Sequence, residues 1–158
     1  MLVRLVAVGR MRDPGLRAAC DEYLRRARRG LPLDVHEVPE AGRRAGRPAD
    51  ARRLEGERLA AAVPAAGRLV ALTRTGRGFS SEELAELVGR WRQEARDVAL
   101  LVGGAFGLDE ALIARADLRL SLSPLTMPHE LARLVLVEQL YRAVTILRGE
   151  PYHKGARR

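Results

Sequence analysis

The chain has 158 residues and a formal net charge of +8, and its 47% apolar and 30% charged residues suit one globular domain spanning residues 1–158. Its single cysteine, Cys20, excludes an intramolecular disulfide and a cysteine-based metal cluster, and its three histidines are not spaced as metal ligands. No apolar run is long enough to span a bilayer and the N-terminus lacks a signal-peptide pattern, so we expect a cytoplasmic protein without membrane or metal.

The positive charge is concentrated in the first half of the chain. Residues 1–79 hold 17 arginines against 9 acidic residues, whereas residues 80–158 hold 11 basic and 11 acidic residues. A basic half suits a polyanion such as nucleic acid. A solvated surface in an arginine-rich protein explains the same pattern equally well.

Apolar runs and amphipathic segments alternate along the chain. The elements are predicted in this order: strand 2–8, helix 14–29, strand 33–38, helix 49–62, strand 68–73, helix 80–95, strand 98–102, helix 109–115, strand 118–122 and helix 130–147. This alternation predicts an α/β fold with a mainly parallel sheet.

Local residues mark several of these boundaries. Pro14 lies in the first turn of its helix, and Ser80 or Ser81 caps another, with Glu83 placed to complete a capping box. Ligands of such sheets bind at the carboxyl ends of the strands. We therefore expect a site in the loops after Leu72, Val102 and Leu122.

The loop after strand 98–102 is rich in glycine. Gly103, Gly104 and Gly107 would permit a tight turn and a close approach of the backbone to a ligand. The spacing is neither a dinucleotide-binding motif nor a phosphate-binding loop. Three glycines in a loop more often serve the turn itself than a ligand.

The segment 121–130 places two serines and two prolines among apolar residues. Its backbone groups would suit the edge of a purine ring, with leucines on the faces of the ring. The simpler interpretation is the start of a helix, with Thr126 or Pro128 as the cap. Further on, the tail 151–154 either frays or uses Tyr152, His153 and Lys154 to stack on a base and contact phosphate.

Several motifs together resemble one known family. These are LVGGAFGL at 101–108, SLSPLTMPH at 121–129, VEQLYRA at 137–143, PYHK at 151–154 and LVAVGR at 5–10. Their order and spacing resemble the ribosomal RNA large subunit methyltransferase H family of the SPOUT superfamily over nearly the whole chain. The chain has Ala105 and Phe106 where many members have a proline and an acid, and Met127 where they have leucine.

The resemblance implies a fold, a reaction and a partner. The fold would be a minimal SPOUT methyltransferase domain with a deep trefoil knot in its C-terminal part, acting as a homodimer with the cofactor at the interface. The reaction would transfer a methyl group from S-adenosyl-L-methionine to N3 of pseudouridine 1915 in 23S rRNA. The substrate would be the assembled ribosome rather than naked RNA.

The resemblance also implies the site. The cofactor would be bound by Leu72, Gly103, Gly104, Leu122, Ser123, Pro124, Leu125, Thr126, Met127 and Pro128. The candidates for RNA binding and charge stabilisation are Arg142, Tyr152, His153 and Lys154, and His129 or His153 is the candidate general base. Arg142 equally suits a simple salt bridge with Glu138 one helical turn away.

A small domain without a separate RNA-binding module must use its own surface. The candidate RNA contacts are Arg10, Arg25, Arg26, Arg43 and Arg44, which would position the RNA rather than read its sequence. Two other functions stay open: a SPOUT enzyme acting on another base or on tRNA, and a ribosome-binding assembly factor without catalysis. An unrelated nucleotide-binding module ranks third.

Overall fold

Five parallel strands form one sheet within residues 1–42 and 46–152, the part of the chain that this computed structural model describes. The strand order is β2-β1-β4-β3-β5. The strands are β1 (Val3–Val8), β2 (Leu33–Val38), β3 (Arg68–Gly78), β4 (Val98–Val102) and β5 (Leu118–Ser121). All pairings are parallel, which is stricter than the mainly parallel sheet predicted from the sequence.

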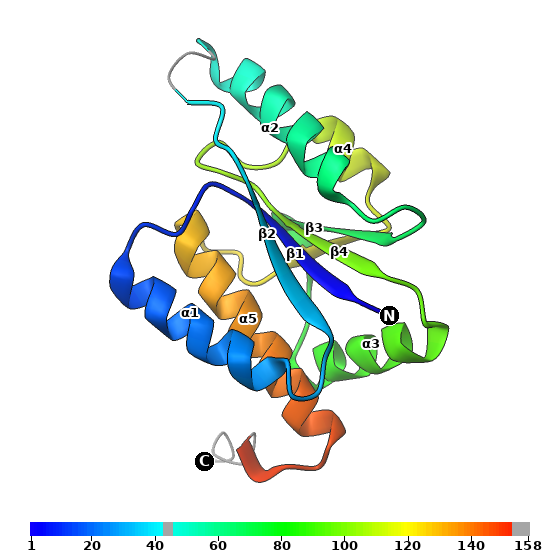
Figure 1. Cartoon of the computed structure of the whole chain (residues 1–158). Coiled ribbons are helices and arrows are strands. Elements are labelled where there is room, and N and C mark those ends of the chain that lie inside the picture. The colour runs from blue at the N-terminus through cyan, green and yellow to red at the C-terminus, as the bar shows by residue number, and fades with distance from the viewer. Residues whose placement is uncertain (43–45, 153–158) are drawn as a thin grey trace.

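Helices cover both faces of this sheet, which makes it a three-layer structure (Figure 1). The helices are α1 (Pro14–Ala27), α2 (Pro48–Ala62), α3 (Ser81–Glu94), α4 (Glu110–Arg115) and α5 (His129–Leu147). On one face lie α1, α3 and α5, and on the other lie α2 and α4. The central strand β4 is buried at every residue, which explains its uninterrupted apolar sequence.

Most predicted boundaries agree with the structure within two residues, and 33–38 and 98–102 agree fully. Of the two candidate caps of α3, Ser80 occupies the position. Its hydroxyl accepts from the Glu83 amide at 3.1 Å, while the Glu83 carboxylate accepts from the Ser80 amide at 2.7 Å. The predicted capping box is therefore present.

One boundary was wrong. The strand predicted over 68–73 continues to Gly78, so no loop follows Leu72 directly. The continuation is stabilised by β5, whose Leu120 faces Leu72 and, after a shift in register, Arg77. The polar sequence after Thr73 gave no sign of this because pairing with a neighbouring strand, rather than burial, extends β3.

Across the described ranges, no helix combines the length and the hydropathy needed to cross a membrane. The same part of the chain holds no group of three or more His, Cys, Asp or Glu side chains arranged to bind a metal ion.

Cys20 lies on the buried side of α1, as a small core residue would. Burial raises the pKa of its thiol, so the reactive thiolate is suppressed. We expect native protein to react with a disulfide reagent such as DTNB only as fast as α1 opens, and unfolded protein to react at once. Absorbance of the released thiolate measures both rates, and immediate labelling of native protein would contradict the expectation.

Candidate active site

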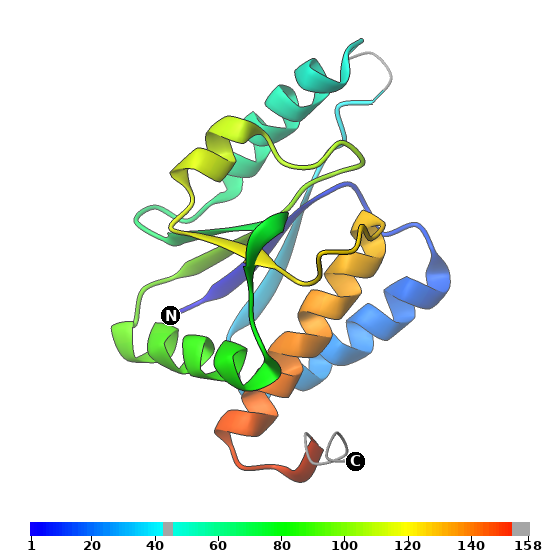
Figure 2. The same cartoon turned by 180° about the vertical axis from the view of Figure 1, so that it is seen from behind.

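A cavity of about 570 Å³ lies where β3, β4 and β5 reach the loops at one edge of the sheet. It collects segments that are far apart in the sequence: β3 near Leu72, the loop after β4, and the connection from β5 to α5, drawn in yellow in Figure 2. Nine of the predicted cofactor residues line it, namely Leu72, Gly103, Gly104, Leu122, Ser123, Leu125, Thr126, Met127 and Pro128. Pro124 does not line the cavity.

Three glycines, which have no side chains, contribute to the wall formed by the loop after β4. A Cβ on Gly103 would stand 2.5 Å from the carbonyl carbon of Gly107, so only glycine fits there. Gly107 has φ of +80°, and its amide donates to the Gly104 carbonyl at 3.0 Å to close the turn. These glycines thus serve the turn and also bring main-chain atoms to the cavity surface.

The connection from β5 to α5 forms the opposite wall. The Ser121 hydroxyl lies within hydrogen-bond distance of two carbonyl acceptors, those of Arg74 at 3.1 Å and Ser123 at 3.0 Å. The Ser123 hydroxyl accepts from the Leu125 amide at 3.0 Å. Pro128, one of the two predicted caps, precedes the first turn of α5 without a side-chain cap bond. This segment therefore starts a helix, as predicted, and also lines a cavity.

Among the cavity residues that the sequence analysis did not predict are two polar ones. Thr73 and Arg74 line it from the extended part of β3, which was predicted to end at Thr73. The Thr73 hydroxyl is buried and has no hydrogen-bond partner among the described residues. No sequence signal indicated this wall, because pairing with β5 extends β3 to form it.

His129, the first residue of α5, also lines the cavity. The next residue, Glu130, accepts from the backbone amides of Arg12 at 3.0 Å and Asp13 at 3.1 Å. These two bonds lower the pKa of the Glu130 carboxyl and fasten the start of α5 to the loop after β1. The position of His129 is fixed in this way.

A second group of polar residues gathers at the other end of α5. Arg142 donates to Glu138 at 2.7 Å, and the Tyr152 hydroxyl bonds the same Glu138 oxygen at 3.1 Å. The Arg142 guanidinium lies 4.9 Å from the centre of the Tyr152 ring. The salt bridge foreseen from the helical spacing is thus present, and it also joins two of the predicted catalytic residues.

Aromatic rings extend this group toward α1. The Tyr141 ring lies 4.7 Å from that of Tyr152 and 6.0 Å from that of Tyr23, and the Arg26 guanidinium lies 5.6 Å from the Tyr23 ring. Burial raises the pKa of Tyr152 above its ordinary value. Arg142 and Tyr152 are therefore held by several contacts each, which suits side chains that must keep one orientation.

The predicted RNA-contacting arginines differ in their surroundings. Arg10 is exposed, whereas Arg25 and Arg26 both pair with Glu22 on α1, at 2.8 and 2.6 Å. Arg43 and Arg44, like the predicted catalytic His153 and Lys154, lie outside the described residues.

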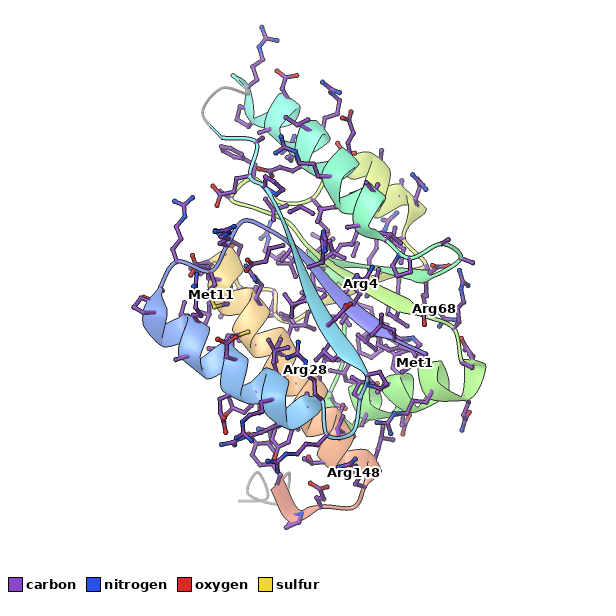
Figure 3. The ribbon with its side chains drawn as sticks, in the orientation of Figure 1. Met1, Arg4, Met11, Arg28, Arg68 and Arg148 are labelled. Atoms are coloured by element: carbon purple, nitrogen blue, oxygen red, sulfur yellow. The ribbon has the colours of Figure 1, made fainter. Side chains whose placement is uncertain are left out.

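The two groups do not meet within one chain. Arg142 lies thirteen positions after His129, which corresponds to a rise of about 20 Å along α5. Figure 3 shows the same separation, with Met11 near the start of α5 and Arg148 just beyond its end. A single protomer therefore holds His129 at the cavity and Arg142 with Tyr152 far from it.

Comparison with known proteins adds to this geometry. Residues 1–153 match the family model described as "Predicted SPOUT methyltransferase". A ribosomal RNA large subunit methyltransferase H from Anaeromyxobacter dehalogenans (strain 2CP-1) is 53% identical over 154 residues, covering 98% of this chain and 100% of the relative. The protein of that name from Thioalkalivibrio sulfidiphilus is 45% identical over 157 residues, covering 98% and 99%. The chain belongs to this methyltransferase family.

A solved structure agrees on the fold of this methyltransferase. A probable methyltransferase from Bordetella pertussis Tohama I superimposes with a TM-score of 0.57 at 20% identity, covering 90% of this chain and 93% of the other. The resemblance stated from the sequence motifs is confirmed at the level of the family, the α/β fold and the class of enzyme.

Proposed function

We propose that this enzyme transfers a methyl group from S-adenosyl-L-methionine to N3 of pseudouridine 1915 in 23S rRNA, on the assembled ribosome in the cytoplasm. Relatives that cover the whole chain carry the name of a ribosomal RNA large subunit methyltransferase. The observation that carries the proposal is the cavity at the strand ends, which nine of the ten proposed cofactor residues line.

The residues at the cavity suit this cofactor. Gly103 has no Cβ, so the backbone of the loop keeps its position at the cavity. The apolar side chains of 122–128 can pack against the faces of a purine. The buried Thr73 hydroxyl has no hydrogen-bond partner among the described residues and is free to bond the cofactor. The cofactor supplies an activated methyl group on a sulfonium. The enzyme's part is to hold that group in line with the attacking nitrogen and to exclude competing water.

The remaining residues manage charge and the proton. N3 of pseudouridine must lose its proton, and negative charge develops on the uracil ring. Arg142, held by Glu138, would stabilise that charge together with Tyr152, His153 and Lys154. His129, at the cavity, or His153 would accept the proton.

The separation along α5 supports a homodimer. One cavity would be completed by Arg142 and Tyr152 of a second copy, because about 20 Å separates these residues from His129 within a protomer. We propose, with this, a single SPOUT domain whose C-terminal part forms a trefoil knot around the loops that line the cavity. Exposed arginines such as Arg10 would contact RNA phosphates.

Methyl transfer from radiolabelled S-adenosyl-L-methionine tests the proposal. We expect label on N3 of one pseudouridine in assembled ribosomes that lack the modification, and none on naked rRNA or tRNA. Mass mapping of the labelled fragment identifies the nucleotide.

The other outcomes point to different functions. Label on tRNA would keep a SPOUT methyltransferase and change its substrate. Failure to bind S-adenosyl-L-methionine in calorimetry, with ribosome binding intact, would favour a ribosome-binding assembly factor.

A further inference from the structure

A second cavity, of about 550 Å³, shares Gly104, Ala105 and His129 with the first. It lies between the glycine loop, the loop after β1, the segment that joins β2 to α2, and the first turns of α2 and α5. Because the same backbone lines both cavities, a ligand that fills the first cavity has one end close to the second cavity.

Glu55 of α2 forms part of this second cavity and is only 6% exposed. One of its carboxylate oxygens, Oε1, accepts from the Ala41 amide at 2.9 Å. The other, Oε2, has no hydrogen-bond partner among the described residues. It stands 3.0 Å from the point where a Cβ on Gly104 would lie, so it faces the shared wall. A buried carboxylate oxygen without a donor is costly unless a ligand supplies one.

The other acidic groups of this cavity already have partners. Glu40 pairs with Arg12 at 3.1 Å, and Glu130 accepts from the amides of Arg12 and Asp13. The basic residues that line the cavity are Arg12 and Arg47, and no bond from either to Glu55 is present in the described part of the chain. The free oxygen is therefore suited to a cationic donor and not to phosphate.

We infer that Glu55 binds the amino-acid end of the methyl donor by accepting a hydrogen bond from its α-ammonium group, which rests on the proposed use of S-adenosyl-L-methionine. No Asp or Glu lines the first cavity within the described residues, so the ammonium has no acidic partner there. Glu55 supplies one at Gly104, where the lack of a Cβ lets the carboxylate pack against the backbone that lines both cavities. The second cavity thus becomes the amino-acid subsite.

Calorimetric binding of two product-like nucleosides tests this. S-adenosylhomocysteine keeps the ammonium group, whereas methylthioadenosine lacks the whole amino-acid end. We expect Glu55→Gln to weaken S-adenosylhomocysteine binding by about tenfold or more, as loss of a charge-assisted bond does, and to leave methylthioadenosine binding within about twofold. Glu57→Gln, on the same helix but exposed and paired with Arg53 at 2.7 Å, is the matched control and should change neither.

Other outcomes overturn the inference in distinguishable ways. Equal weakening of both nucleosides would give Glu55 a purely structural role, which thermal unfolding of the variant would register. Unchanged affinities with slower methyl transfer would show that Glu55 acts on the target nucleotide and not on the cofactor. Wild-type protein that binds neither nucleoside would overturn the proposed use of the cofactor itself, and the amino-acid subsite with it.

Discussion

Replacing Arg142 with alanine should abolish most methyl transfer while leaving cofactor affinity unchanged. Removal of one preorganised group that stabilises developing charge costs on the order of 10²- to 10³-fold in turnover. Arg142 is preorganised by Glu138 at 2.7 Å and by the Tyr152 ring at 4.9 Å. Arg142 is proposed to act on the uracil ring and is not among the residues that line the cofactor cavity, so its loss should leave cofactor affinity unchanged. Labelled methyl transfer to ribosomes and calorimetric binding of S-adenosylhomocysteine measure the two effects.

Two further variants show whether charge or mere packing is involved. Arg142→Lys keeps the charge and loses the planar fork, so we expect it to recover only part of the activity. Arg115→Ala removes an exposed arginine of α4, on the other face of the sheet, and should leave turnover unchanged. Full turnover by the Arg142→Ala enzyme would show that Arg142 does not stabilise charge in the reaction and only forms the salt bridge with Glu138.

The sequence predicted this fold well because burial dictates most of its elements. The run at 98–102 is apolar at every position and becomes the fully buried strand β4, and Ser80 with Glu83 marks the start of α3 within one turn. These signals are local, so they predict an element without any information about the segments that pack against it. Periodicity and capping therefore determined the number, type and order of elements.

The site was less accessible to prediction because it depends on contacts between distant segments. Extension of β3 beyond Thr73 requires β5, some forty residues later, and it brings Thr73 and Arg74 to the cavity. Likewise, the sequence around Glu55 predicts a solvent-exposed acidic residue on a helix. Its burial results from packing against Gly104, which the sequence does not indicate. The motifs predicted Leu72, the glycine loop and 121–129 as lining residues, whereas Thr73 and Arg74 of the first cavity and Glu55 of the second required three-dimensional structure.

Replacing Gly103 with alanine should both destabilise the enzyme and weaken cofactor binding. The added Cβ would stand 2.5 Å from the carbonyl carbon of Gly107 and 2.7 Å from the Leu108 nitrogen, both of them backbone atoms. The loop must therefore move, and overpacking of this kind costs about 1–3 kcal/mol. A displaced loop would no longer present its backbone to the cavity, so we expect S-adenosylhomocysteine affinity to fall by about tenfold or more. Urea unfolding and calorimetry measure the two changes.

Gly78→Ala separates this steric effect from the general cost of changing a glycine. A Cβ at Gly78 would meet no atom within 4 Å, and its φ is not left-handed, so stability and affinity should stay close to those of the wild type. A Gly103→Ala enzyme that lost stability yet kept its cofactor affinity would show that the loop after β4 serves only the turn. Loss of both would mean that Gly103 is needed for the turn and for the position of the cofactor-binding backbone, so that the one role cannot be altered without the other.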